Sequence, residues 1–395
     1  MRELLPISLV LLFSILSCSG RNEGFENFTF FLEKTINFEN EMYAIHNMEF
    51  RGFEDSLLYG YDIGRAAIFK FDQKGNLLES NRFQNGENEI DLLTLRDVYP
   101  VNRDSIFIVE SGYNNLLLLD GNLKIINSWN IRKLTDSKVN LGRSNPQIVN
   151  FDYIDQVPYI TLVAMDGDLD PTEKEFFEES FLAAKINLLT GEFIPMFKYP
   201  NESPYRKYLF WGDESAYILY HENKYYVTFP LDPNLYVFTE HSNDYHIIYY
   251  TGELNKSTTG VNFGMNQSEF LENHYLEVFH IKNDFNLISK SILKISDKKY
   301  FVRAVRKAIN VNNIDSKDIN TFRLKGPKQD FILQIFELEE DVDGQLWKEF
   351  LLPKHYKNYS FIDQEGKFYF KENNEESEKY SIDVLTWSFN DLSKL

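Results

Sequence analysis

The stretch DSIFIVESGYNNLLLLDGNLKIINSW (Asp104–Trp129) decides the fold, because a similar stretch stands about 49 residues earlier in the chain. The earlier copy reads DSLLYGYDIGRAAIFKFDQKGNLLES (Asp55–Ser80). Each copy holds short apolar runs rich in Ile, Leu and Phe, and the last two runs are separated by a turn that contains a glycine (Gly75 or Gly121). Such runs, bounded by turn residues, are typical of β-strands. Each copy is therefore predicted to form strand, loop, strand, tight turn and strand.

Weaker copies of this unit follow along most of the chain. They lie at Pro158–Phe197, Glu214–Tyr250, Asp330–Leu352 and Tyr359–Phe389. A repeat near 50 residues with three or four strands in each unit predicts a β-propeller. The strands of a blade can be apolar on both faces, as Leu116–Leu119 is, because each blade packs between two neighbours. The predicted fold class is all-β, and the spacing fits a six-bladed propeller best.

Two features leave the blade count open. The first is Gly252–Lys299, which fits the repeat poorly. Within it, Gln267–Tyr275 could form a short helix and Ile281–Ile295 a hairpin. The segment is therefore either an insertion or a seventh blade. A β-sandwich is the competing fold, although a sandwich rarely needs this many residues or such a repeat. The early strand Thr29–Ile36 is predicted to join the last blade and close the ring. The propeller domain is expected to span residues 28–395.

The first residues predict export. Residues 4–16 form an apolar run of about 13 residues, which is shorter than the roughly 20 residues of a membrane-spanning helix but suits a secretory signal. The run ends at Ile15-Leu16-Ser17-Cys18, which resembles the lipobox of lipoprotein signal peptidase. We predict a signal peptide at residues 1–17, acylation of Cys18 and a polar tether at residues 18–27. More than one acyl chain gives stable anchoring without a transmembrane helix.

Composition narrows the chemistry and the partners. Cys18 is the only cysteine, so the lipidated chain has no thiol left for a disulfide, a metal site or a nucleophile. The chain has 41 Lys+Arg against 60 Asp+Glu and a net charge of −19, so nucleic acid is not an expected partner. The same charge is repelled by anionic lipid, and the acyl chains alone are expected to hold the protein on the membrane. Ser19 is not an acid that would retain the protein in the inner membrane, which favours the outer membrane on either its periplasmic or its external face.

Several scattered motifs resemble those of a known family. They are Asp72 to Gly75 with its following strand, Asp297–Arg303, Leu351–Lys354, Asp363–Tyr369 and Asp383–Trp387. The chain resembles a family of Bacteroidota lipoproteins known as domain of unknown function 4221. Where that family has two adjacent tyrosines before an arginine, this chain has Phe301-Val302 in part of the pattern. The resemblance implies a propeller-like lipoprotein, and it implies no activity because the family has none assigned.

One basic, aromatic-flanked cluster stands out in the acidic chain. It contains Tyr300, Arg303 and Arg306, followed by Lys307. On a strand, Arg303 would share a face with Phe301 and could lie at the mouth of the propeller channel, where a guanidinium binds a carboxylate or sulfate. The alternative, an ion pair between blades with one of the many acids, is the favoured interpretation of Arg303, and ligand binding is the functional hypothesis for this cluster. Tyr300, Arg303 and Arg306 are therefore the predicted ligand-binding residues.

Other motifs are incomplete. Asp166–Asp170 has carboxylates at alternate positions, as a calcium loop does, but Pro171 stands where the loop needs glycine, so a solvated acidic loop is favoured. The seven histidines form no recognisable metal set, and the sequence has no nucleophile elbow, phosphate loop or dinucleotide fingerprint. No catalytic residue, metal or cofactor is predicted.

Two functions remain. The first is a binding or scaffold propeller that presents loops from several blades to a protein or a glycan, because the sequence shows blades and turns but no catalytic constellation. The alternative is a carbohydrate-active hydrolase or lyase with carboxylates from different blades around the channel. Tyrosines and tryptophans would then stack on the sugar. Activity as an enzyme is the less favoured of the two.

Overall fold

The computed structural model describes the chain as two compact units, Phe31–Thr386 and the two chain ends (Met1–Phe30 with Trp387–Leu395). In the second of these, the described residues are the ends of two strands, 28–30 and 387–389. The described residues of the whole chain are 28–38, 48–54, 56–62, 66–83, 95–141, 146–210, 215–240, 243–252, 260–269, 285–288, 292–295, 298–306, 331–338, 345–352, 356–362, 367–372 and 380–389.

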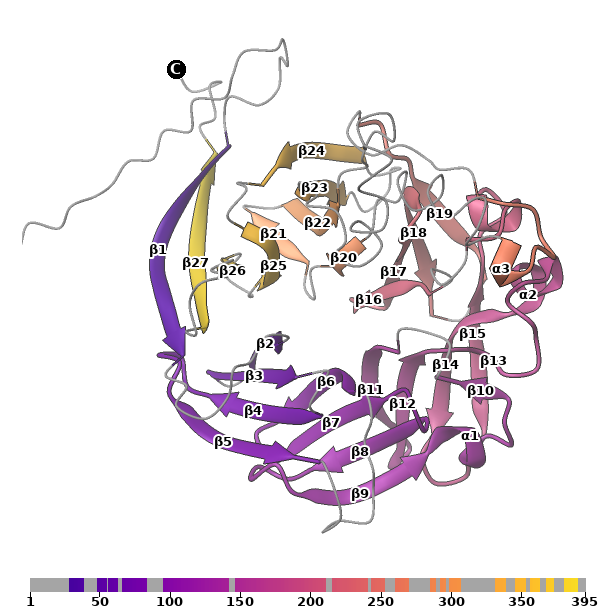
Figure 1. Ribbon diagram of the computed structural model, residues 1–395, viewed down its shortest axis with the longest axis horizontal. Helices are drawn as coiled ribbons and strands as arrows, with labels where there is room; N and C mark the ends of the chain where they lie inside the picture. The colour runs from indigo at the N-terminus through magenta and orange to yellow at the C-terminus, as the bar shows by residue number, and fades with distance from the viewer. Residues whose placement is uncertain are drawn as a thin grey trace, which may run out of the picture. The chain divides into compact units, whose positions relative to one another are not determined.

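The described residues form antiparallel sheets whose strands mostly follow one another in the chain (Figure 1). The first sheet contains β2 (Met48–Glu54), β3 (Leu57–Asp62), β4 (Ala67–Phe71) and β5 (Leu77–Arg82). The next contains β6 (Leu95–Asn102), β7 (Ser105–Glu110), β8 (Asn115–Leu119) and β9 (Ile125–Asn130). The third contains β11 (Ile148–Ile154), β12 (Val157–Val163), β14 (Phe181–Asn187) and β15 (Phe193–Lys198).

Three further sheets complete the series. One contains β16 (Tyr217–His221), β17 (Lys224–Phe229), β18 (Asp232–Thr239) and β19 (Tyr245–Ile248). One contains β20 (Phe285–Ile288), β21 (Leu293–Ile295), β22 (Lys298–Arg306), β23 (Phe331–Leu338) and β24 (Gln345–Leu351). The last contains β25 (Tyr356–Ile362), β26 (Phe368–Glu372), β27 (Tyr380–Phe389) and β1 (Phe28–Phe38). The prediction of an all-β chain is confirmed.

Short elements lie in the segments between these strands. They are β10 (Val139–Asn140), which pairs with β13 (Met165–Asp166), and the helices α1 (Ile131–Leu134), α2 (Lys174–Glu179), η1 (Pro204–Arg206) and α3 (Gln267–Glu269). Of these, α3 falls in the predicted helix Gln267–Tyr275, whose residues from 270 onward lie outside the described residues. Within the described part of the chain, no helix has the length and apolar character needed to cross a membrane.

The burial of the strands explains why the apolar runs are continuous rather than alternating. All seven residues of β14 are buried, whereas β5 at the edge of its sheet is mostly exposed. A middle strand covered by sheets on both faces cannot alternate apolar and polar residues. The side chains of successive sheets pack together in apolar clusters, such as the one that joins Phe107 and Leu116 to Ile160 and Ile186. The core therefore lies between sheets that are neighbours in the chain.

The first two copies of the sequence repeat share the same turn between their third and fourth strands. Asp72 Oδ1 accepts hydrogen bonds from the backbone N–H groups of Lys74 (2.8 Å) and Asn76 (2.9 Å). Asp120 Oδ1 accepts the equivalent bonds from residues two and four positions on, at 2.9 and 2.8 Å. Gly75 has a φ of +87°, and a Cβ there would meet the backbone oxygen of Asn37. An aspartate that caps its own turn fixes the hairpin locally, so the first two copies were predicted correctly.

Contacts between sheets run in chain order and return to the start. Strands β6, β11 and β16 contact one another in turn, β25 contacts both β20 and β2, and β2 contacts β6. Between the fourth and fifth sheets, Tyr226 stacks on Phe301 with ring centroids 6.2 Å apart. Strand β1 lies beside β27, which confirms the predicted pairing of Thr29–Ile36 with the last sheet. This order differs from the two packed sheets of a β-sandwich.

The poorly fitting segment Gly252–Lys299 contributes to the fifth sheet. Strand β20 pairs with the second half of β22, and β21 pairs with its first half. The predicted hairpin at Ile281–Ile295 is therefore wrong, because both strands pair with β22 rather than with each other. The two strands together occupy the edge position beside β22 and so complete this sheet.

The sheets have two different ends. At the turn end, tight turns join first to second strands and third to fourth strands, as at 155–156, 222–223, 72–76 and 120–124. The connection end holds the segments that join second to third strands and one sheet to the next, and these range from two residues (230–231) to the long segments 131–147 and 164–180. Hydrogen bonds link the turn ends of neighbouring sheets: Lys70 Nζ donates to Gly121 O, and Lys185 Nζ donates to Glu240 Oε1 (3.0 Å). The turn ends of successive sheets therefore lie side by side.

Candidate functional site

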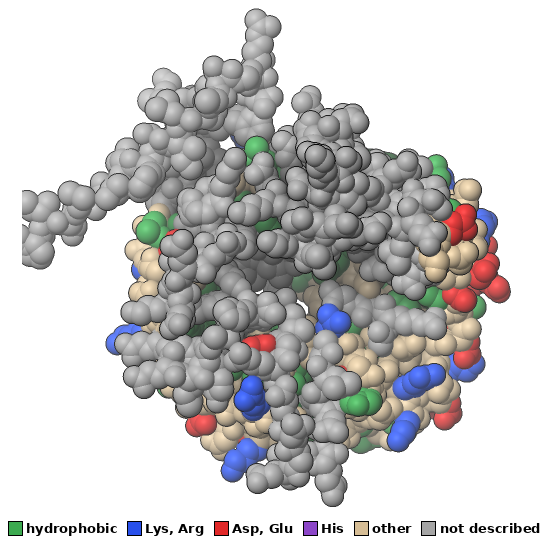
Figure 2. Space-filling view, viewed as in Figure 1, with side chains coloured by type: hydrophobic (Ala, Val, Ile, Leu, Met, Phe, Trp, Pro, Cys, Tyr) green, Lys and Arg blue, Asp and Glu red, His purple; other side chains and the backbone are tan. Residues whose placement is uncertain are grey.

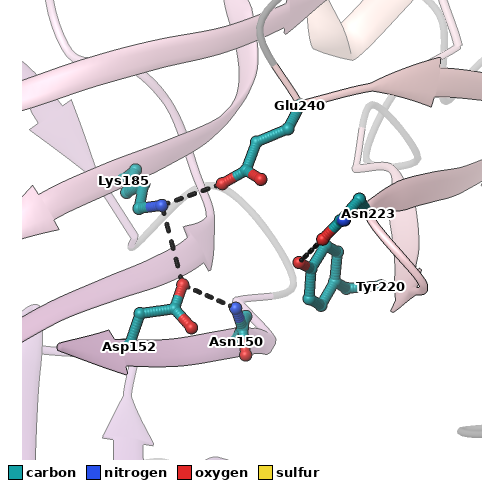
Figure 3. Close-up of polar contacts among 6 residues, drawn as sticks. All are labelled: Asn150, Asp152, Lys185, Tyr220, Asn223 and Glu240. Atoms are coloured by element: carbon teal, nitrogen blue, oxygen red, sulfur yellow. Dashed lines mark hydrogen bonds and ion pairs between the residues drawn. The ribbon is translucent and has the colours of Figure 1, made fainter. Parts of the chain in front are cut away.

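A polar cluster joins the third and fourth sheets at the turn end (Figure 3). Lys185 Nζ donates to Glu240 Oε1 at 3.0 Å and lies 3.6 Å from Asp152 Oδ2. Asn150 Nδ2 donates to the same Asp152 oxygen at 2.7 Å. The Lys185 side chain is only 8% exposed, whereas those of Asp152 and Glu240 are 37% and 22% exposed. The ammonium is therefore buried between two carboxylates that reach solvent.

The sequence positions these groups through strand register. Asn150 and Lys185 both lie opposite Thr161 of the central strand β12, so the two side chains share one face of the sheet. Asp152 lies two residues beyond Asn150 on the same face of β11. Glu240 follows the last residue of β18 in the next sheet. The cluster is thus formed by one face of the third sheet (β11 and β14) and by the end of β18 in the fourth sheet.

The charges of the cluster keep Lys185 protonated. Burial lowers the pKa of Lys185, but its hydrogen bond to Glu240 and the charges of Glu240 and Asp152 outweigh burial and raise the pKa overall. A protonated ammonium is neither a nucleophile nor a general base. The cluster can bind a polar ligand through its exposed carboxylate edges, but Lys185 is not poised for covalent chemistry.

A comparison with the first sheet shows what is distinctive about this cluster. Lys70, two residues before Asp72, donates from Nζ to the backbone oxygen of Gly121 in the turn of the next sheet. Lys185 makes the corresponding link to the turn of its own next sheet, but its acceptor is the Glu240 side chain. Asp72 and Asp120, which also follow third strands, cap their own turns. Glu240 instead accepts a hydrogen bond from Lys185 of the preceding sheet. The acceptor of this link between sheets is therefore a carboxylate, whereas that of Lys70 is a backbone carbonyl.

Two tyrosines border the cluster. Tyr220 and Tyr225 lie opposite each other on β16 and β17, with ring centroids 4.7 Å apart, and Tyr220 Oη donates to Asn223 Oδ1 at 2.9 Å. The Tyr225 hydroxyl is buried and has no hydrogen-bond partner among the described residues. Burial first, and then the negative charge of Glu240, raise the pKa of Tyr225. Carboxylates beside an aromatic pair are the arrangement that the carbohydrate-active alternative requires.

The predicted ligand-binding residues lie elsewhere, on β22. Tyr300 is 5% exposed and Arg303 is fully buried, while the Arg306 side chain lies outside the described residues. Arg303 Nε donates to Gln334 Oε1 (2.7 Å), and its Nη1 donates to Thr228 Oγ1 (3.0 Å). The guanidinium also donates to Pro233 O and lies 4.7 Å above the Phe336 ring. Protein groups on three strands thus hold Arg303, and a role for this cluster in ligand binding stays a prediction.

Asp232 belongs to the same buried region. Its carboxylate accepts hydrogen bonds from Tyr236 Oη (2.6 Å) and from the backbone N–H of Asn234 (3.0 Å). Burial raises the pKa of Asp232 despite these bonds, a further bond from Ser203 and the positive charge of Arg303. The group lies at the connection end, at the start of β18, and its hydrogen bonds connect β18 to Ser203, the residue before η1.

The acidic loop Asp166–Asp170 uses its carboxylates internally. Asp166 Oδ1 accepts from the Asp168 backbone N–H (2.9 Å), Asp168 pairs with Lys138, and Asp170 Oδ1 accepts from Thr172 (2.9 Å). In the described part of the chain, no three His, Cys, Asp or Glu side chains are grouped as metal ligands would be. The loop therefore has the capping bonds of an acidic turn.

Sequence reasoning missed the Lys185 cluster, although one signal was present. Lys185 is the one charged residue in the strand FLAAKIN (Phe181–Asn187). A lysine inside a continuously apolar strand needs a partner, because burying an unpaired charge is costly. The partners could not be named, since Asp152 and Glu240 are distant from Lys185 in the sequence and become neighbours only through the packing of two sheets.

The fold defines the class of protein. Four-stranded antiparallel sheets that follow one another in the chain, with contacts that return to the first sheet, make this chain a β-propeller protein. It is similar to the crystal structure of a member of the DUF4221 family from Bacteroides vulgatus, with a TM-score of 0.65 and 16% identity. The match covers 92% of this chain and 99% of that one. The predicted resemblance is confirmed at the level of the fold.

Two other solved structures are similar over most of the chain. A candidate exported protein from Bacteroides fragilis is 9% identical with a TM-score of 0.49, covering 91% of this chain and 95% of that one. A virginiamycin B lyase from Staphylococcus aureus is 12% identical with a TM-score of 0.43, covering 91% and 99%. No protein-family model matches the sequence, and no curated protein matches it significantly.

Proposed function

We propose that this chain is an exported, lipid-anchored member of the DUF4221 family, with a six-bladed propeller that binds a protein or a glycan. The blade count is supported by the six sheets of four or five strands among the described residues. It is also supported by β20 and β21, which extend an existing sheet instead of forming another. Strand β1 beside β27 would close the ring as the outermost strand of the last blade.

Cys18 supplies the proposed anchor. The lipobox-like Ile15–Cys18 follows an apolar run of signal-peptide length, and Cys18 is the only cysteine in the chain. The fold similarity to a DUF4221 member is consistent with the lipoprotein character that the resemblance implies. Lipid attached at Cys18 would leave residues 18–27 as a tether before β1 (Phe28–Phe38). We place the protein in the cell envelope, with the outer membrane favoured.

One observation carries the proposal of binding: the two ends of the sheets are unequal. The turns at the turn end are as short as 155–156 and 222–223. At the connection end, the segments 131–147 and 164–180 carry α1, α2 and the β10–β13 pair. Long loops on a rigid scaffold are where binding residues concentrate. We therefore assign the partner to the connection end, where Figure 2 shows acidic side chains grouped over α2.

The segments at the connection end are firmly held. Phe176 and Phe177 of α2 are fully buried and pack on Tyr199 and Tyr205. Arg206 Nη1 donates to the Phe177 backbone oxygen at 2.6 Å, which ties η1 to α2. Such a surface is pre-organised, and a pre-organised surface loses less conformational entropy on binding.

The alternative, a carbohydrate-active enzyme, is favoured by a different observation. Asp152 and Glu240 share Lys185 and lie near Tyr220, which is partly exposed and could stack on a sugar, whereas Tyr225 behind it is fully buried. However, a retaining or inverting glycosidase places the scissile bond between its two carboxyl groups, and here the buried ammonium of Lys185 occupies that position. Binding of a sugar without turnover fits this cluster better than hydrolysis does.

The test is crosslinking and affinity capture from intact cells, followed by incubation of the pure chain with a panel of polysaccharides. The proposal predicts a reproducible partner or a retained glycan, with no product released. The Glu175→Lys variant, on the exposed side of α2, should weaken capture, whereas Lys124→Glu at the turn end should leave it unchanged. Glycan turnover that the Glu240→Gln substitution abolishes would show that the enzyme alternative is correct.

A further inference from the structure

Large apolar side chains that are exposed gather at one end of the sheets. Among the described residues, eight of them lie in the tight turns at the turn end or within the strand residues next to those turns. We call them the apolar rim: Leu32, Leu77, Leu78, Ile126, Tyr153, Ile154, Leu189 and Ile194. The other exposed large apolar residues, Tyr113, Tyr249 and Leu351, lie at the connection end.

The apolar rim is part of the repeat. The outermost strand of four different sheets carries an exposed Leu or Ile in its first half, at the second residue of β5, β9 and β15 and at the fifth residue of the longer β1. These residues are Leu32 in β1, Leu77 and Leu78 in β5, Ile126 in β9 and Ile194 in β15. Single exposed apolar residues are normal on a soluble protein. The same position exposed in sheet after sheet indicates a surface with a common environment.

The predicted anchor enters at this end of the sheets. Glu33 pairs at 3.1 Å with Lys367, which follows the turn between β25 and β26. Glu33 of β1 therefore lies beside the turn-end start of β26 in the last sheet. Residues 18–27 span at most about 35 Å when fully extended, because a residue adds no more than about 3.5 Å. An acylated Cys18 would thus hold the turn end close to the lipid surface.

We propose that the apolar rim rests on the surface of the bilayer into which Cys18 is anchored, which leaves the connection end facing away from it. This inference rests on the proposed lipid anchor and adds an orientation to it. Leu and Ile side chains at the interface gain from leaving water, and polar turn residues such as Asn122 and Thr190 remain among the headgroups. The net charge of −19 opposes anionic lipid, so the contact should be strongest on zwitterionic membranes.

The experiment uses cysteine labels in the lipidated full chain. Acylation consumes the Cys18 thiol, so a cysteine introduced by Ile126→Cys or Leu78→Cys is the only free thiol for an environment-sensitive fluorophore. Tyr113→Cys at the connection end is the matched control, because Tyr113 is also exposed. Incorporation of labelled palmitate first establishes that the anchor is present. The proteins are then reconstituted in phosphatidylcholine–phosphatidylethanolamine vesicles with or without lipids that carry a doxyl quencher.

The inference predicts blue-shifted emission and quenching by doxyl lipids at Ile126→Cys and Leu78→Cys, and neither effect at Tyr113→Cys. Labels in water at all three positions, or equal quenching at all three, would overturn it. A rim label that is shielded but unquenched, with a second copy crosslinked to it, would overturn it in favour of self-association. Failure to incorporate palmitate would instead contradict the proposed anchor, so the two failures are distinguishable.

Discussion

The two ends of the sheets each bury a cation, and the two cations are held in different ways. Lys185 at the turn end lies between the carboxylates of Asp152 and Glu240, which reach solvent. Arg303 towards the connection end is fully buried and donates to neutral oxygens of Gln334, Thr228 and Pro233. The planar guanidinium can use several fixed acceptors at once, whereas an ammonium is a point charge that needs anions. The first cation forms an ion pair between sheets, and the second connects three strands.

The difference indicates where substitution would be tolerated. Removing Arg303 leaves its buried acceptors without a donor. It also removes the positive charge near the carboxylate of Asp232. Removing Lys185 leaves two carboxylates that water can partly solvate. The energetic cost should therefore be greater for Arg303, even though both residues join neighbouring sheets.

The largest expected effect is that of Arg303→Met. The substitution keeps apolar volume beside Phe336 but removes every hydrogen bond of the guanidinium, and each buried acceptor that is left unpaired costs about 1–3 kcal/mol. Urea unfolding followed by tryptophan fluorescence measures the change in the free energy of unfolding. A loss below about 1 kcal/mol would contradict the role that we assign to Arg303, since an ordinary surface substitution stays within about 0.5 kcal/mol.

Lys185→Met should destabilise less, by about 1–3 kcal/mol, because it removes one charge-assisted hydrogen bond and leaves two carboxylates close together. The same unfolding measurement applies. Glu240→Gln is the matched control, since an amide can still accept from Lys185. If Lys185→Met costs as much as Arg303→Met, the exposure of the carboxylates does not matter and the comparison fails.

The contribution of Lys185 should also depend on pH. Its pKa is raised above the ordinary 10.5, so its stabilisation is complete below 10.5 and is lost as the pH rises through the raised value. The difference in free energy of unfolding between the wild type and Lys185→Met should stay constant near neutral pH and shrink at alkaline pH. Both proteins share their tyrosines, so ionisation of those distant from Lys185 cancels in the difference. Tyr220 is the exception, because burial raises its pKa while the charge of Lys185 lowers it. A difference that grows with alkaline pH would have the wrong sign.

The smallest effect is expected at an exposed ion pair. Lys138 and Asp168 pair near the connection end, with side chains 56% and 55% exposed. Exposed pairs contribute little because water and salt screen them. Lys138→Ala should leave the denaturation midpoint unchanged within error at moderate salt. A clear loss of stability would mean that exposure is a poor guide to the value of ion pairs in this protein.

The sequence predicted the strands of the first two copies because the signals there are local. Asp72 and Asp120 cap turns within four residues of themselves, so the pattern is complete inside one hairpin. The segment Gly252–Lys299 was harder, because β20 and β21 are defined by their pairing with β22 rather than by a turn of their own. When two strands pair with another strand and not with each other, the residues between them need not form a recognisable turn in the sequence.

The site residues show the same limit. The sequence singled out Arg303 as an unusual cation, but its acceptors Thr228 and Pro233 lie about 70 residues away in the chain. Lys185 was missed because its partners belong to other strands. The one charged residue in an apolar strand was the available signal, and it identifies a buried charge without identifying what neutralises it.

The most direct test of the account is the lipid at Cys18. Cells that express the wild type or Cys18→Ala are labelled with palmitate, and the mature N-terminal peptide is identified by mass spectrometry. The account predicts that labelled wild-type protein begins at an acylated Cys18 and sediments with membranes, while Cys18→Ala carries no label and is soluble. A wild-type chain that is unlabelled, or that begins at another residue, would contradict it.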